Sequence, residues 1–189
     1  KRVEHWRAKV VGFRDYIYDD EPLVDNDFTE DLPVLKKQLE SLEAVGGGDL
    51  PESLLDAIYY VATMEQTDKG ATEFDPKKWR HRSEVARIVI ILTDASFHER
   101  MEKPEGGTID DLANACHSNR IILRGFVPDM DCYDNLCEIN HCDLYLIPFD
   151  ESDGEGAVKA LVEFTGDAEN FPSMVTRVSV SVAAACADL

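Results

Sequence analysis

The feature that most constrains the fold is the run at 85–92, which reads VARIVIIL and is almost entirely aliphatic. Apolar runs without polar alternation are typical of strands that are buried on both faces of a parallel sheet. The run leads directly into Thr93-Asp94-Ala95, so we expect Asp94 at the carboxyl end of a strand. Ligands of open α/β sheets bind at that edge. Asp94 is therefore the first candidate site residue.

Helical and extended periodicities alternate along the rest of the chain. Four leucines between 32 and 42 recur at helical spacing and predict an amphipathic helix whose polar side chains form its wetter face. The patterns predict strands at 8–13, 23–28, 85–92, 121–127 and 143–149, and helices at 31–45, 51–64, 108–118, 133–139, 156–164 and 173–187. This order predicts one α/β domain over 1–189. It is Rossmann-like and doubly wound, with a mostly parallel sheet and an antiparallel edge hairpin.

Charge and composition narrow the classes of partner. The chain has 189 residues, 38 of them acidic and 19 basic, so its formal net charge is −19. This charge disfavours nucleic acids and anionic membranes and favours cations and basic partners. No apolar run approaches the ~20 residues of a membrane-spanning helix, and the charged N-terminus has no signal-peptide core. Five cysteines, an odd number, predict reduced thiols and a cytoplasmic protein.

The loop at 46–52, which reads GGGDLPE, has two interpretations that do not exclude each other. Asp49 followed three residues later by Glu52 is a capping-box pattern, with Pro51 in the first helical turn. Alternatively, Asp49 faces a hard cation such as Mg²⁺ together with Asp94, because such cations prefer oxygen ligands. A phosphate loop is disfavoured, since the Gly-Lys-Ser/Thr ending is missing.

Three motifs, VGFRDY at 11–16, GGGDLPESLLDA at 46–57 and ILTDA at 91–95, occur in an order that resembles von Willebrand factor A (VWA) domains. The likeness is to the branch with a GGGDxPE loop. It implies a doubly wound α/β fold with a metal-ion-dependent adhesion site. By position, Asp49 would replace the loop threonine of that site, and Asp94 would be its last acid. The implied Mg²⁺ or Mn²⁺ would accept an Asp or Glu carboxylate from a partner protein.

One part of the family pattern is missing. Its first metal motif, D-x-S-x-S, follows a strand that would precede the strand at 8–13. The sequence DESDG at 150–154 contains only D-x-S and lies at the wrong end of the chain. We therefore expect that the first strand and helix of the domain lie upstream of Lys1, or that another segment supplies the strand. A degenerate, metal-free VWA domain is the alternative.

Other polar residues receive structural interpretations. Cys132, Cys137, His141 and Cys142 contain enough ligands for zinc but lack the Cys-x₂-Cys knuckle, so we expect packing. We expect His98 to be a solvated loop residue. For Asp15 we expect a structural hydrogen bond or a pair with Arg14.

The functional expectation is a non-enzymatic module that binds a protein partner through a divalent cation. The alternative is a regulatory or recognition part of an ATPase-, kinase- or bacterial defence-associated enzyme system. A Mg²⁺-dependent hydrolase is a third reading. A triad of Asp94, Ser96 and His98 is disfavoured, because side chains so close in sequence rarely converge.

Overall fold

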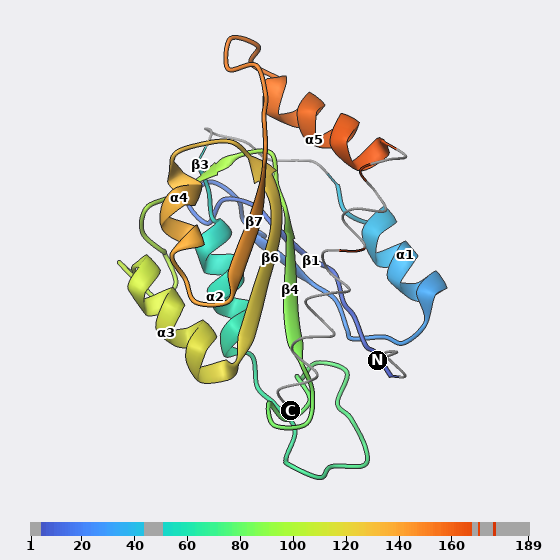
Figure 1. Ribbon diagram of the computed structural model, residues 1–189. Coiled ribbons are helices and arrows are strands. Elements are labelled where there is room, and N and C mark those ends of the chain that lie inside the picture. Colours follow the sequence, from blue (N-terminus) through green and yellow to red (C-terminus); the bar gives the residue numbers. More distant parts are fainter. Residues whose placement is uncertain (1–4, 44–50, 168–169, 171–175, 177–189) are drawn as a thin grey trace.

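The computed structural model describes residues 5–43, 51–167, 170 and 176. A three-stranded parallel sheet, ordered β4-β6-β7, forms its centre (Figure 1). The strands are β4 (Arg87–Leu92), β6 (Ile121–Pro128) and β7 (Cys142–Ile147). The helices are α1 (Leu32–Glu40), α2 (Leu54–Thr63), α3 (Ile109–Asn119), α4 (Cys132–Cys137) and α5 (Gly156–Gly166). The mixed α/β class predicted from the sequence is confirmed.

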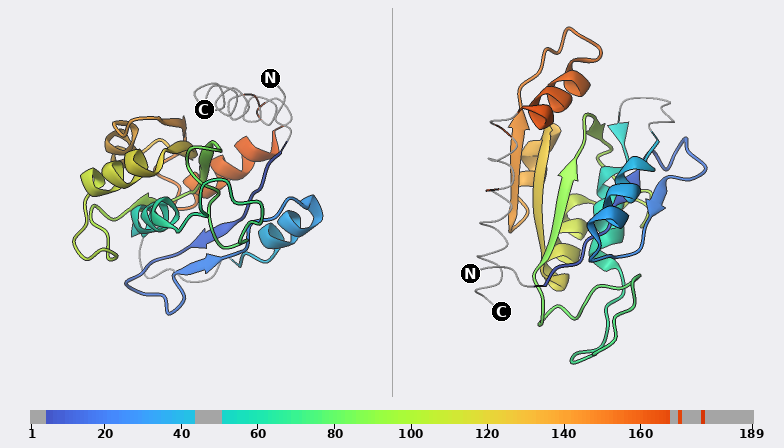
Figure 2. Two further views of the ribbon diagram at one scale, coloured as in Figure 1. Left: turned by 90° about the horizontal axis from the view of Figure 1, so that it is seen from below. Right: turned by 90° about the vertical axis from the view of Figure 1, so that its right-hand side faces the viewer.

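Helices cover both faces of this sheet (Figure 2). On one face, Leu112 and Cys116 of α3 are buried in a core with Leu123 of β6. On the opposite face, Phe164 of α5 stacks on Tyr145 of β7 with ring centroids 4.8 Å apart. The sheet is therefore the middle layer between α2 and α3 on one side and α5 on the other.

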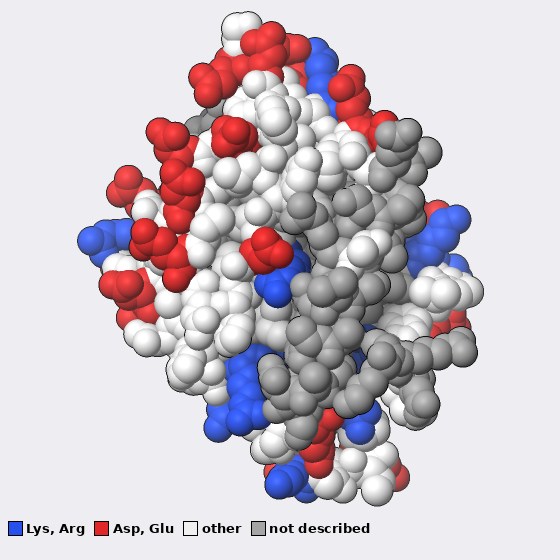
Figure 3. All heavy atoms as spheres, in the orientation of Figure 1, with Lys and Arg blue, Asp and Glu red and all other residues white. Residues whose placement is uncertain are grey.

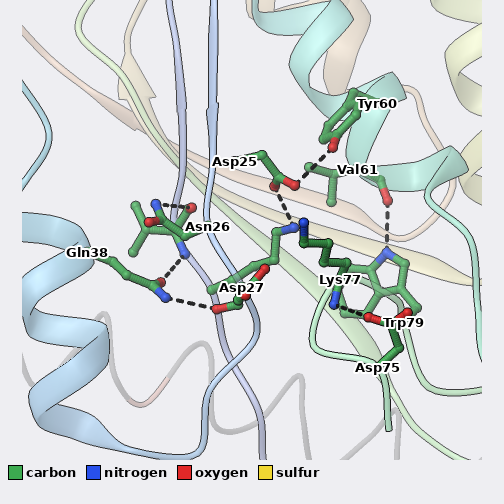
Figure 4. Close-up of polar contacts among 11 residues, drawn as sticks. Asp25, Asn26, Asp27, Gln38, Tyr60, Val61, Asp75, Lys77 and Trp79 are labelled. Carbon is green, nitrogen blue, oxygen red and sulfur yellow. Dashed lines mark hydrogen bonds and ion pairs between the residues drawn. The ribbon is translucent and has the colours of Figure 1, made fainter.

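The predicted hairpin is present. β1 (Val11–Phe13) pairs antiparallel with β2 (Leu23–Asp25), with Gly12 opposite Val24. Polar side chains attach the hairpin to its helices (Figure 4). Gln38 of α1 accepts a hydrogen bond from the Val10 amide (3.0 Å) and donates one to the Asp27 carbonyl (2.8 Å), and the Tyr60 hydroxyl of α2 donates to Asp25 (2.9 Å).

The orientation predicted for α1 is wrong. Gln38 is the buried residue of this helix, whereas Leu32 and Leu39 are 65% and 54% exposed. The physical reason is that the Gln38 amide satisfies backbone groups of the hairpin, so that this one polar side chain faces inward. Leu35 is partly buried, and the charged side chains of the helix are exposed as predicted.

The predicted start of α2 is also wrong. The helix begins at Leu54 with Ser53 as its N-cap residue, so Pro51 does not lie in the first turn. Pro51–Glu52 instead forms the short strand β3, which pairs in parallel with β5 (Ser96–Phe97). This pairing holds Glu52 extended and outside the helix, whereas the expected capping box would need it in the first helical turn; Asp49 lies outside the described residues. A capping box does occur at α3, with Thr108 as its N-cap residue.

β4 is not buried on both faces as predicted. Ile91 is buried, but Ile90 and Leu92, on the opposite face, are 50% and 47% exposed. The register pairs Leu92 with Phe126 and Ile90 with Arg124, so these side chains share the face that α5 covers farther along the sheet. Within the described ranges, β4 pairs only with β6.

The amino end of β4 carries a buried arginine. Arg87 is 1% exposed, and its guanidinium group donates to the Gln66 side chain and to the carbonyls of Arg80 (2.7 Å) and Asn119 (3.3 Å). Asn119 is the last residue of α3, so the positive charge lies at the negative end of a helix dipole. Burial, and to a lesser degree Arg82, lowers the pKa of Arg87 to about 10.

Other predicted elements are confirmed within a few residues of their expected bounds. Between α2 and β4, residues 65–84 form turns and a single bridge between Gln66 and Trp79. The predicted helix at 173–187 lies outside the described residues except for Thr176, which is helical. Over the part that the structure describes, no helix has the length and apolar character to cross a membrane.

Candidate functional site

Asp94 lies where the sequence placed it, immediately beyond the carboxyl end of β4. Thr93 before it is buried, and its hydroxyl accepts a hydrogen bond from the Ala95 amide (3.3 Å). The Tyr133 hydroxyl of α4 donates to the Ala95 carbonyl. These contacts fix the backbone on either side of Asp94, while its own side chain is only partly buried.

The β3–β5 pair brings a second acid to this edge. Pro51 lies opposite Ser96 and Glu52 opposite Phe97, and the His98 amide donates to the Glu52 carbonyl (3.2 Å). The segment that follows Asp94 is therefore joined to the segment that precedes α2. Sequence periodicity did not reveal β3 or β5, because each strand has only two residues.

Asp15, two residues beyond β1, is the centre of a buried network. One carboxylate oxygen accepts from the Ile17 amide (2.7 Å) and the Ser53 hydroxyl (3.3 Å), and the other pairs with His98 Nε2 (3.0 Å). The Ser53 oxygen in turn accepts from the Tyr16 amide (2.9 Å). Asp15 is 2% exposed, so it is a structural anchor that joins the hairpin to α2 and to the loop after β5.

Two expectations for these residues are therefore corrected. His98 is not a solvated loop residue, because its side chain is 19% exposed and pairs with Asp15. Asp15 does form a structural bond, but not with Arg14, whose guanidinium donates to the Glu43 carbonyl (3.2 Å). Residues 15 and 98 are 83 positions apart, and no local pattern in the sequence signals such a pair.

Asp15 and Glu52, two acids of this edge, have pKa values that are shifted in opposite directions. Burial alone would raise the pKa of Asp15, but hydrogen bonds from Ile17, His98 and Ser53 hold it below its ordinary value. Glu52 has the opposite environment. Burial, together with the charges of Asp15, Asp19 and Asp94, raises the pKa of Glu52. One Glu52 carboxylate oxygen, Oε2, is fully buried and has no hydrogen-bond partner within the described residues.

Of the two predicted metal ligands, Asp49 and Asp94, the structure describes only Asp94. Asp49 and the glycines before it lie outside the described residues, so the structure does not place Asp49 relative to Asp94. Asp94 and Glu52 supply carboxylate oxygens, the donors that Mg²⁺ prefers. Among residues 5–43 and 51–167, however, no three acidic, histidine or cysteine side chains are grouped as a metal site. The described carboxylates are the type of donor that a hard cation prefers, but they are too few to form its complete set of ligands.

The side chains of the cysteine-rich segment are not grouped together in the described structure. Cys132, Cys137, His141 and Cys142 all lie in the described part of the chain, and they do not gather into a metal-binding group. Burial raises the pKa of Cys142 to about 12, and it packs with Cys132 against the core. Packing, the alternative expected from the sequence, describes Cys132 and Cys142, whereas Cys137 and His141 are exposed.

Sequence reasoning missed Asp56 near this edge. Asp56 is 2% exposed on α2, and its Oδ1 accepts from the amides of Glu102 (2.9 Å) and Lys103 (2.7 Å). The Lys103 ammonium lies 4.8 Å from the centre of the Tyr16 ring. A polar residue in the otherwise apolar helix LLDAIYYVAT was the available signal. Its role is to hold the loop after β5.

The surface charge agrees with an acidic protein. Acidic side chains gather along the left and upper margins of the view in Figure 3, over α3, α4 and the loop before α5. No protein-family model matches the chain, and a search of curated proteins found no match either.

Proposed function

We propose that this chain is a protein–protein interaction module of the VWA type, which binds a partner's Asp or Glu carboxylate through a divalent cation. The observation that supports the proposal best is the meeting of like charges at one edge. Asp15, Asp19 and Asp94 all contribute to raising the pKa of the half-buried Glu52. A divalent cation would relieve this repulsion. A Rossmann-like order with an edge hairpin and a strand upstream of 8–13 belongs to the same proposal.

Within this proposal Asp49 and Asp94 hold Mg²⁺ or Mn²⁺. The ion supplies an open coordination position for the partner's carboxylate. Asp15, His98 and Ser53 hold the surrounding backbone in place. The module acts without catalysis, as part of a larger cytoplasmic system.

Metal binding by the chain itself tests this proposal. Titration with Mn²⁺, followed by the electron paramagnetic resonance signal of the free ion, should show one site that EDTA abolishes. Asp94→Asn should weaken binding at least tenfold, because one charged ligand is lost. Asp20→Asn, at an exposed acid of the hairpin turn, is the matched control and should leave affinity unchanged. Equal weakening by both substitutions would indicate only general attraction to an acidic surface.

A metal-free recognition module is the second candidate. It is favoured by the absence of a three-ligand group in the described ranges and by the closed network around Asp15. In this case the domain would serve as the recognition part of an ATPase-, kinase- or defence-associated system. If the chain showed no saturable Mn²⁺ binding, this candidate would be favoured over the first.

A further inference from the structure

The loop between α2 and β4 carries an arginine without an acceptor, at the opposite end of β4 from Asp94 (Figure 1). Arg80 is partly buried, and its Cζ atom lies 3.9 Å from the centre of the Phe74 ring. Its Nε is fully buried and has no hydrogen-bond partner among the described residues. Neither terminal nitrogen of this guanidinium group hydrogen-bonds to a described residue, and both reach solvent. The stacked side chain of Arg80 therefore has donors free for a ligand.

The other partly or fully buried arginines in the described ranges all have oxygen acceptors. The side chains of Arg7, Arg14, Arg87 and Arg124 each donate to at least one backbone carbonyl. A partly buried charge without an acceptor costs free energy, because it has lost contact with water and has gained no partner in return. Arg80 is therefore an exception that a bound anion would explain.

A second cation lies over the same aromatic ring. The Arg7 Cζ atom is 5.6 Å from the centre of the Phe74 ring. Burial, and next the charge of Arg80, lower the pKa of Arg7, whereas the charges of Glu30 and Asp75 act in the opposite direction. Two like charges are thus held at one ring. An anion that contacts both guanidinium groups would relieve their repulsion.

We propose that Arg80, aided by Arg7 and held by the Phe74 ring, binds a carboxylate group of a protein partner. A planar guanidinium group presents parallel N–H donors that match both oxygens of a carboxylate. Stacking on Phe74 fixes the plane of these donors before the ligand binds. A phosphate dianion fits less well, because Glu30 and Asp75 already act on Arg7 and the whole chain has a net charge of −19. This inference does not depend on the proposed metal site, which lies at the other end of β4.

The Nε–Hε signals of the arginine side chains in proton–nitrogen NMR spectra of the full chain test the proposal. The probes are the α-amide of N-acetylglutamic acid, which carries a side-chain carboxylate, and N-acetylglycine, which carries a terminal carboxylate. The Arg80 signal should shift saturably, and the probe that binds more tightly identifies the source of carboxylate that the site prefers. The neutral α-amide of N-acetylglutamine should leave the signal unchanged. Arg120 is the control, because its exposed side chain also has no hydrogen bond and lies over no aromatic ring in the described part of the chain.

Two matched substitutions separate paired donors from charge alone. Arg80→Lys keeps a positive charge near Phe74 but loses the planar pair of donors, so the affinity measured at the Arg7 signal should fall about fivefold. Arg120→Lys should leave that affinity unchanged. The comparison of the Arg80 and Arg120 signals in the unsubstituted chain holds even if a variant fails to fold.

Three results would overturn the inference. The first is an Arg80 signal that shows no saturable shift with either probe, or that shifts equally with chloride at the same ionic strength. The second is full affinity in a folded Arg80→Lys chain, since paired donors would then play no part. The third is tighter binding of inorganic phosphate than of both carboxylate probes, which would contradict the choice of a carboxylate.

Discussion

The two ends of β4 differ in the groups that surround a buried charge. At the amino end, the Arg87 guanidinium donates to three acceptors, although its Nε has no hydrogen-bond partner among the described residues. At the carboxyl end, Glu52 lies among acids of its own sign, and its Oε2 has no hydrogen-bond partner among the described residues. Burial and like charges disfavour the charged form of both side chains. Three hydrogen bonds offset this effect at Arg87, which is typical of a structural contact, whereas a group of acids is typical of a place where something binds.

Among the substitutions that test this comparison, Arg87→Met should change the free energy of unfolding most. The substitution leaves the carbonyls of Arg80 and Asn119 buried without a donor, so we expect the free energy of unfolding to fall by about 3–4 kcal/mol. Urea denaturation followed by circular dichroism measures the change. Arg100→Met is the control, because Arg100 is exposed and makes one bond to the Gly106 carbonyl (3.1 Å). If Arg87→Met were as mild as the control, the amino end would not be a structural anchor.

Asp15→Asn should have the next largest effect. It should lower the free energy of unfolding by about 1–2 kcal/mol at pH 7, because the charge that pairs with His98 is lost. The pKa of Asp15 is lowered from 3.8 on folding, so its carboxylate stabilises the fold above that pH. The contribution disappears as the pH falls through the lower, folded-state value. The difference between the two proteins in urea should therefore shrink between pH 5 and pH 3. If the difference in the free energy of unfolding did not depend on pH, the loss of stability would come from altered packing or hydrogen bonding and not from the lost charge.

Glu52→Gln should change the free energy of unfolding least, and it should raise this free energy where the other two substitutions lower it. The pKa of Glu52 is raised from 4.5 on folding, so its ionised form destabilises the folded state at neutral pH. Removing the charge should raise the free energy of unfolding by up to about 1 kcal/mol at pH 7. The gain should vanish below pH 4, where both side chains are neutral.

Measurements in added NaCl and in Mg²⁺ test whether charge repulsion explains the result for Glu52. In 0.5 M NaCl the gain from Glu52→Gln should shrink, because salt screens partly exposed charges. If a divalent cation binds at this edge, saturating Mg²⁺ should stabilise the unsubstituted chain and narrow the gap between the two proteins. Destabilisation by Glu52→Gln in metal-free buffer at pH 7 would contradict the described repulsion.

The sequence predicted the elements of the sheet better than it predicted their surroundings. The aliphatic run ending at Asp94 and the helical pattern at 108–118 are local signals, and both elements formed where expected. Helical spacing in α1 identified the helix but not the side that faces inward, because Gln38 satisfies backbone groups 11 and 28 positions away. Periodicity carries no information about such partners.

The candidate site shows the same limit. Asp94 was predicted because it follows a strong strand, and that position is confirmed. The Asp15–His98 pair and the place of Glu52 depend on contacts between segments far apart in sequence, and on strands of two residues. Asp49 stays a prediction, because residues 44–50 lie outside the described ranges.

The indole of Trp79 has a consequence for how the molecule can be observed. Trp79 is 9% exposed, its Nε1 donates to the Val61 carbonyl (2.8 Å), and the Arg87 guanidinium lies 5.6 Å from its ring centre. The other tryptophan, Trp6, is 39% exposed. Intrinsic fluorescence should therefore report chiefly on the Arg87 end of the sheet, through the blue-shifted emission of one sheltered ring. The acidic end carries neither tryptophan, so a local opening there would leave the tryptophan emission unchanged.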